Sequence, residues 1–172
     1  LKEAVVHSLS VVIHDASQLA ILKETPLTEL VAQYGRLNLW LKVNSGMNRL
    51  GFLPDDLMSV IKTLLANELV SLNVIMTHFA TSELPESAIF KGQCVRFNEI
   101  IKNIQSGFLN EHFLISAANS AALIQSPMSD FDICRPGIML YGASPIKTKS
   151  AIDLGLKPVM SFCSCIIAVQ SL

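Results

Sequence analysis

Short apolar runs alternate with longer amphipathic stretches along most of this chain. The runs at residues 10–14, 38–42, 72–76 and 113–116 are rich in Val, Ile and Leu, and a further, less apolar run covers residues 132–135. Continuous apolar runs of this length are typical of parallel strands that are covered on both faces. Strands that alternate with helices predict a parallel sheet with right-handed crossovers, which places the chain in the α/β class.

The stretches between these runs carry helix signals. Asp15 precedes one stretch as a candidate N-cap, and Pro54 stands at the first position of another. The spacing of apolar residues predicts a longer helix over residues 86–105. We expect its buried side to consist of Ala88, Ile89, Val95, Phe97 and Ile101.

Composition and charge narrow the class of protein. Hydrophobic residues make up 51% of the 172 residues and charged residues 16%, yet no apolar run reaches the roughly 18 residues of a membrane helix. The N-terminal residues lack the basic and then apolar order of a secretory signal. A net charge of -1 gives no basic surface for nucleic acid. We therefore expect a cytoplasmic protein that binds neither membrane nor nucleic acid.

The four cysteines show no spacing that indicates a metal site. No CxxC pair is present and no histidine is placed to complete a ligand set. We expect reduced and mostly buried thiols. They are Cys94, Cys134, Cys163 and Cys165.

Polar side chains gather where the predicted strands end. In a parallel barrel the carboxyl ends of the strands share one rim, where ligands bind. Each of the last four runs is followed by a candidate ligand residue, and several of these residues are cationic. The pattern predicts one site for a small anionic ligand, made by Lys42 with Arg49, His78, Asn119 with Ser120, and Arg135.

Four motifs at these strand ends resemble those of the alanine racemases, a family of pyridoxal-phosphate enzymes. They read Leu-Lys-Val-Asn-Ser-Gly-Met-Asn-Arg-Leu-Gly at 41–51, Met-Thr-His-Phe-Ala at 76–80, Ala-Asn-Ser-Ala-Ala at 118–122 and Arg-Pro-Gly-Ile-Met-Leu-Tyr-Gly-Ala-Ser-Pro at 135–145. The wording of the first motif looks closer to the catabolic branch of the bacterial enzymes.

The resemblance implies a fold and a division of the chain. The family has a (β/α)8 barrel domain followed by a C-terminal β domain. Residues 1–150 are similar to the C-terminal half of the barrel, about its last five strand–helix units. Residues 151–172 are similar to the linker and the first strand of the β domain. We expect the chain to be part of a longer protein, with an unpaired strand edge near residues 11–14.

The resemblance also implies roles for the cationic residues. Arg135 would face the pyridine nitrogen of the cofactor, and its guanidinium would keep its proton. His78 would hydrogen-bond to Arg135 without touching the cofactor, or else be an ordinary core histidine. Arg49 would bond the phenolic oxygen of the cofactor and approach the substrate carboxylate. Lys42 would be carbamylated, since a cationic amine beside Arg49 would be repelled.

The remaining site residues would hold the phosphate. Ser120 and the backbone amides of Gly137 and Ile138 match the family's phosphate cradle. Ser120 could instead be a plain helix N-cap. Asn119 would line the site more loosely.

The activity implied is the interconversion of L-alanine and D-alanine through a pyridoxal-phosphate aldimine, which would supply D-alanine for the cell wall or, in the reverse direction, feed alanine catabolism. The family uses a lysine and a tyrosine as its two bases, the tyrosine coming from the partner in a homodimer with a shared site. Neither base has a match here, so we expect the chain alone to be inactive. A broad-specificity or serine racemase of the same fold, and a non-catalytic pyridoxal-phosphate barrel protein, are the alternatives.

Overall fold

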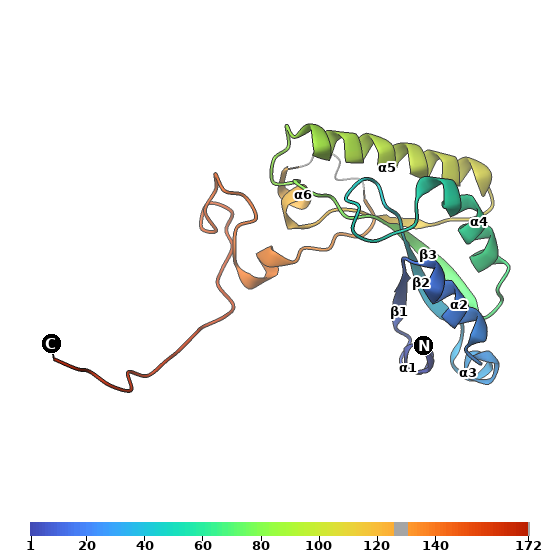
Figure 1. The fold of residues 1–172 in the computed structure, drawn as a ribbon, viewed down its shortest axis with the longest axis horizontal. Coiled ribbons are helices and arrows are strands. Elements are labelled where there is room, and N and C mark those ends of the chain that lie inside the picture. The colour runs from blue at the N-terminus through green and yellow to red at the C-terminus, as the bar shows by residue number, and fades with distance from the viewer. Residues whose placement is uncertain (126–130, 172) are drawn as a thin grey trace.

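A four-stranded parallel sheet in the order β1-β2-β3-β4 forms the centre of the molecule (Figure 1). The computed structural model describes residues 1–125 and 131–171. Each strand pairs with the next along the chain, so every connection is a crossover, and the predicted α/β class is confirmed. The strands are β1 (Ser10–Ile13), β2 (Leu37–Lys42), β3 (Val70–Met76) and β4 (Leu114–Ser116).

The two central strands show why the apolar runs become strands. Alternate residues of β2, namely Leu37, Leu39 and Leu41, have no exposed surface and lie in the main core with residues of the helices. The residues between them, Asn38 among them, are half-buried on the other face. There Asn73 of β3 donates a hydrogen bond to Asn38 at 2.9 Å. Within the described residues β2 is therefore fully buried on one face only, unlike the two-sided cover that the apolar runs predicted.

Helices connect the strands. Asp15 caps α2, because its carboxylate accepts a hydrogen bond from the Ser17 amide at 2.9 Å, and Pro54 begins α4; both confirm the predicted starts. Two short helices, α1 and α3, lie outside the predicted set. The helices are α1 (Lys2–Val6), α2 (Ala16–Glu24), α3 (Thr28–Tyr34), α4 (Pro54–Leu65), α5 (Ala88–Gly107) and α6 (Ser120–Gln125), followed by a 3₁₀-helix over Ile138–Tyr141.

The buried side of α5 differs from the prediction. Ile89 and Val95 are 57% and 58% exposed, so placing them in the core was wrong, whereas Phe97 is buried as expected. Phe97 and Phe90 both lie edge-on to Phe79, with ring centroids 6.3 and 5.3 Å away. The buried positions follow the helical repeat of three and four, and they are Phe90, Gln93, Cys94, Phe97, Ile100 and Ile104.

The predicted fifth strand at residues 132–135 is wrong. Only Ile133 bridges β4, through Ser116, and the Ile133 amide donates to the Ile115 carbonyl at 3.1 Å. The Asp132 carboxylate accepts a hydrogen bond from the Ile115 amide at 2.7 Å, so this amide does not pair with a backbone carbonyl of a fifth strand. Pro136 follows at once and has no N–H to extend a ladder. Among the described residues the sheet therefore ends at β4.

Residues 156–171 belong to no helix or strand, and they extend away from the sheet (Figure 1). Phe162 and Ile167 are 97% and 98% exposed. The strand expected here forms no ladder with any described residue, and its assignment to a second domain stays a prediction. No helix among the described residues is long and apolar enough to cross a membrane.

The cysteines are free, as expected, but only Cys94 is buried. Burial raises the pKa of the Cys94 thiol, which keeps it protonated. Cys134 is half-buried, and Cys163 and Cys165 are exposed on the C-terminal segment. The expectation of mostly buried thiols was therefore wrong, because it assumed a packed C-terminal segment.

The corrected face of α5 yields a stability prediction. We expect Phe97→Ala to lower the free energy of unfolding by about 3–5 kcal/mol, because it opens a cavity under the aromatic cluster. Val95→Ala on the same helix should change it by no more than about 0.5 kcal/mol. Urea denaturation followed by circular dichroism measures both, and equal losses would contradict this burial pattern.

Candidate functional site

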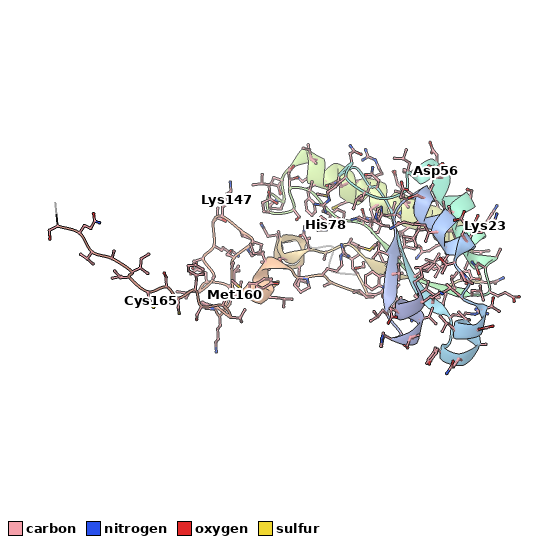
Figure 2. All side chains as sticks on the ribbon, turned by 60° about the horizontal axis from the view of Figure 1, so that its bottom comes forward. Lys23, Asp56, His78, Lys147, Met160 and Cys165 are labelled. Carbon is pink, nitrogen blue, oxygen red and sulfur yellow. The ribbon has the colours of Figure 1, made fainter. Side chains whose placement is uncertain are left out.

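The predicted site residues lie together at the carboxyl edge of the sheet, on two adjoining hollows. A pocket of about 390 Å³ is lined by His78, Asn119, Ser120 and Arg135 together with Gly137 and Ile138. A tight recess beside it is lined by Lys42, Arg49 and again His78. Figure 2 labels His78 near the middle of the molecule and Met160 and Cys165 along the extended C-terminal segment. His78 is the residue common to both hollows.

Arg135 is anchored to the ends of two strands. Its guanidinium donates to the Thr77 carbonyl at 2.5 Å, to the Ser116 hydroxyl, and to the Ala117 carbonyl at 3.5 Å. The Ser116 hydroxyl in turn donates to the Ile133 carbonyl at 2.8 Å. Burial lowers the pKa of Arg135, yet a guanidinium remains protonated in proteins. A fixed and partly buried cation therefore stands at the pocket wall.

His78 is not hydrogen-bonded to Arg135 in this structure, in contrast to the expected contact. Among the described residues, the guanidinium uses backbone carbonyls and a serine hydroxyl instead. Burial lowers the pKa of His78, and the charges of Arg135, Arg49 and Lys42 lower it further. The imidazole is therefore held in its neutral form near pH 7.

The recess is strongly positive. Burial lowers the pKa of Lys42, and the charges of Arg49 and Arg135 add to that shift. The ion pairs found among the described residues are His7 with Glu3 and Lys91 with Glu86, and neither involves these three cations. Like charges held together without a carboxylate are stabilised by an anionic ligand.

A tight turn holds Lys42 and Arg49 at the recess. Phe52 donates to the Lys42 carbonyl at 3.0 Å, and Asn44 donates to the Phe52 carbonyl at 2.9 Å. At Gly51, φ is +119° and an added Cβ would lie 2.7 Å from the Asn44 nitrogen, so only glycine fits. The turn therefore brings position 52 back to the end of β2 and keeps both cations at one place.

Two buried hydroxyl groups join this turn to β3. Ser45 Oγ and Thr77 Oγ1 are 2.7 Å apart, and Thr77 Oγ1 donates to the Val43 carbonyl at 2.9 Å. Sequence analysis missed both residues, and also Ser116. The signal that could have found Thr77 and Ser116 is a hydroxyl residue that ends an apolar run.

Asn119 and Ser120 both line the pocket, and Asn119 rather than Ser120 caps the helix that follows. The Asn119 carbonyl oxygen accepts from the Ala122 amide at 3.0 Å, so Asn119 caps α6, and it also accepts from the Ser82 hydroxyl at 2.8 Å. Its amide nitrogen donates to the Phe79 carbonyl at 3.2 Å. The alternative that Ser120 is the cap was therefore wrong.

The Ser120 hydroxyl accepts instead from the Met139 amide at 3.3 Å. Ser120 thus faces the segment that follows Arg135, where Gly137 and Ile138 lie. A Cβ added at Gly137 would meet no atom within 4 Å, so the backbone there borders open space. This arrangement leaves backbone and hydroxyl groups accessible at one wall of the pocket.

Comparison with known proteins gives matches to alanine racemases, both for the family model and for individual relatives. The sequence model of a family described as "Alanine racemase, N-terminal domain" matches residues 1–145. A protein named alanine racemase from Nitrosospira multiformis is 40% identical over 169 residues, which cover 96% of this chain and 43% of that protein. One of the same name from Legionella pneumophila (strain Lens) is 41% identical over 171 residues, covering 99% of this chain and 44% of that protein.

Solved structures that resemble this chain are also alanine racemases. The structure of alanine racemase from Acinetobacter baumannii superimposes with a TM-score of 0.77 at 37% identity, over 92% of this chain and 41% of that chain. The biosynthetic alanine racemase from Pseudomonas aeruginosa gives a TM-score of 0.69 at 35% identity, over 91% and 40%. This chain spans less than half the length of the relatives that it matches.

The charge cluster leads to a prediction about His78. Since Arg49 is one of the charges that lower its pKa, we expect Arg49→Gln to raise the pKa of His78 toward its ordinary value of about 6.5. An NMR titration of the imidazole protons measures the shift. Arg36→Gln removes the same charge at an exposed position outside the site and should leave the pKa unchanged.

The same shift sets the sign of the pH dependence. His78 has a lower pKa folded than unfolded, so the unfolded chain binds more protons between the two values. The contribution of His78 to the free energy of unfolding is therefore complete above about pH 6.5 and is lost as pH falls through the folded pKa. Arg49→Gln should make this loss smaller; an equal loss in both proteins would contradict the electrostatic account.

Proposed function

Because the chain belongs to the alanine racemase N-terminal-domain family, we propose that the protein containing it interconverts L-alanine and D-alanine, with pyridoxal phosphate as its cofactor. The strands and helices described here are part of the family's (β/α)8 barrel. The observation that carries the proposal is the meeting of Lys42, Arg49, Arg135 and His78 at one edge, without a carboxylate among the described ion pairs.

The pocket fits the proposed cofactor in size and in donor groups. Its volume of about 390 Å³ lies in the range of small-ligand sites. The Ser120 hydroxyl and the backbone near Gly137 supply neutral donors of the kind that bind phosphate. Arg135 supplies a fixed cation across the same pocket. When bound, pyridoxal phosphate would supply the electron sink that acidifies the Cα proton of an amino acid.

Arg135 would act by keeping its own proton. Its contacts with Thr77 and Ser116 hold the guanidinium in place, so a remaining N–H can be presented to a ring nitrogen without proton transfer. His78, neutral and close to this group, would add bulk and polarity without adding a positive charge.

Arg49 and Lys42 would serve the substrate side. Arg49 is exposed and offers a planar donor fork, which matches a carboxylate. The lowered pKa of Lys42 increases the fraction of neutral amine, the form that adds carbon dioxide to give a carbamate. A carbamate would place a negative charge beside Arg49 and Arg135 and replace repulsion with attraction.

The finer features of the proposal come from the family resemblance. We infer that the lysine and tyrosine bases lie in the parts of the relatives' length that this chain does not span. We also infer that the full-length protein is a homodimer, with the tyrosine supplied by the partner subunit. Residues 1–150 would complete a barrel with those parts, and residues 151–172 would lead into a second domain. A cytoplasmic location and a role in cell-wall supply remain predictions of the same kind.

Racemisation itself tests the proposal. We expect the full-length protein with pyridoxal phosphate to convert L-alanine to D-alanine, as measured by chiral chromatography, and residues 1–172 alone to give no turnover because neither base has a match in them. Absence of turnover by the full-length protein would overturn the proposed function. Faster turnover of serine than of alanine would replace the substrate.

The phosphate role of Ser120 has its own test. We expect Ser120→Ala in the full-length protein to weaken the binding of pyridoxal phosphate about tenfold, because a hydrogen bond to a charged group is lost. Binding of unphosphorylated pyridoxal should change little. Fluorescence titration with both compounds measures this, and Ser106→Ala, an exposed serine on α5, is the matched control. Equal weakening for both compounds would exclude a phosphate contact.

A further inference from the structure

Helix α5 contacts the two loops that carry Arg49 and His78. Arg96 donates from Nη1 to the Ser45 carbonyl at 2.8 Å, in the turn between Lys42 and Arg49. Gln93 accepts from the Ala80 amide at 2.9 Å, two residues after His78. Each loop is therefore bound through its backbone to a side chain of the same helix.

The two side chains stand three positions apart on α5, which places them side by side on one helix face. The helix itself is fixed, because Phe90 and Phe97 pack edge-on against Phe79, which directly follows His78. A rigid helix with two polar side chains aimed at two loops can set the distance between those loops.

The contact of Arg96 is close and specific. A Cβ added at Gly46 would lie 2.3 Å from Arg96 Nη1, so the turn approaches the guanidinium more closely than a side chain would allow. Ser45 has no exposed surface, and a buried carbonyl left without a donor is costly. Although Arg96 is an exposed residue of the helix, its guanidinium therefore contacts a buried part of the turn between Lys42 and Arg49.

The loops are also joined to each other. The hydroxyl groups of Ser45 and Thr77 are 2.7 Å apart and form a hydrogen bond between the two loops. With Arg96 on Ser45 and Gln93 on Ala80, the contacts form a closed frame of helix, turn and loop. None of these contacts involves the cofactor pocket directly.

We propose that Arg96 and Gln93 are positioning residues, which fix the Arg49 turn relative to the His78 loop and so set the geometry of the cationic recess lined by Lys42, Arg49 and His78. The proposal rests on the proposed function for the identity of the ligand. The mechanical part, that Arg96 holds the turn, is independent of any ligand.

The first test measures that mechanical part. In the full-length protein, amide hydrogen exchange by NMR reports on the Asn44 and Phe52 amides, which close the turn. We expect Arg96→Met to speed their exchange about tenfold, as for loss of a charge-assisted hydrogen bond, and Arg96→Lys to restore part of the protection. Lys102→Met removes the same charge from an exposed position of α5 and should change nothing. Equal exchange in Arg96→Met and Lys102→Met would overturn the proposal.

A second variant separates the two contacts. Gln93→Met removes the acceptor of the Ala80 amide, and it also removes an amide nitrogen that is buried without a partner among the described residues. We expect faster exchange at Ala80 with the Asn44 and Phe52 amides less affected than in Arg96→Met. Faster exchange at all amides of the sheet would mean general unfolding and would count against a positioning role for Gln93.

The full-length protein loaded with pyridoxal phosphate provides the functional readout. Arg96→Met should raise KM for alanine about tenfold with a smaller change in kcat, because Arg49 approaches the substrate carboxylate. If the wild-type protein shows no racemisation, the proposed function fails while the exchange result still stands. If racemisation is normal and Arg96→Met leaves KM unchanged, the positioning role is wrong and the proposed function is unaffected.

Discussion

The hydrogen bonds of Arg135 are the constraint on which the site depends. One guanidinium binds the Thr77 carbonyl at the end of β3 and the Ser116 hydroxyl at the end of β4, and Thr77 in turn binds Val43 and Ser45 after β2. The partners of the guanidinium are almost entirely buried, where an unpaired polar atom would be expensive. Satisfying them together fixes three strand ends in one arrangement.

That arrangement concentrates positive charge. Lys42 and His78 both have lowered pKa values, first because they are partly buried and then because of the neighbouring arginines. A protein selected only for stability would place a carboxylate here or move a cation to solvent. Perturbed groups grouped at a strand edge are characteristic of functional sites, where stability is lost in favour of binding.

The sequence predicted those parts of the fold that depend on local burial. The starts of β1 to β4 lie within a few residues of the predicted runs, because an apolar run must be buried wherever it folds. The fifth strand was wrong, because pairing depends on the neighbouring strand and Asp132 occupies the Ile115 amide. Ile89 and Val95 looked suitable for the core, but only a neighbour's position decides which helix face is covered. The polar residues of the candidate site were predicted from their places at strand ends and their roles from the family resemblance. Contacts between distant residues, such as Ser45 with Thr77 or Arg96 with Ser45, leave no pattern in the sequence.

The anchoring of Arg135 has a consequence for the order of folding. Its partners Thr77 and Ser116 stand 58 and 19 positions earlier in the chain, so the bond to Thr77 closes a long loop that includes the crossover between β3 and β4, whereas the bond to Ser116 closes a shorter one. Closing long loops costs entropy before any contact repays it, which makes such pairings late events. The cationic edge of the sheet is therefore complete only when the chain has reached its native topology.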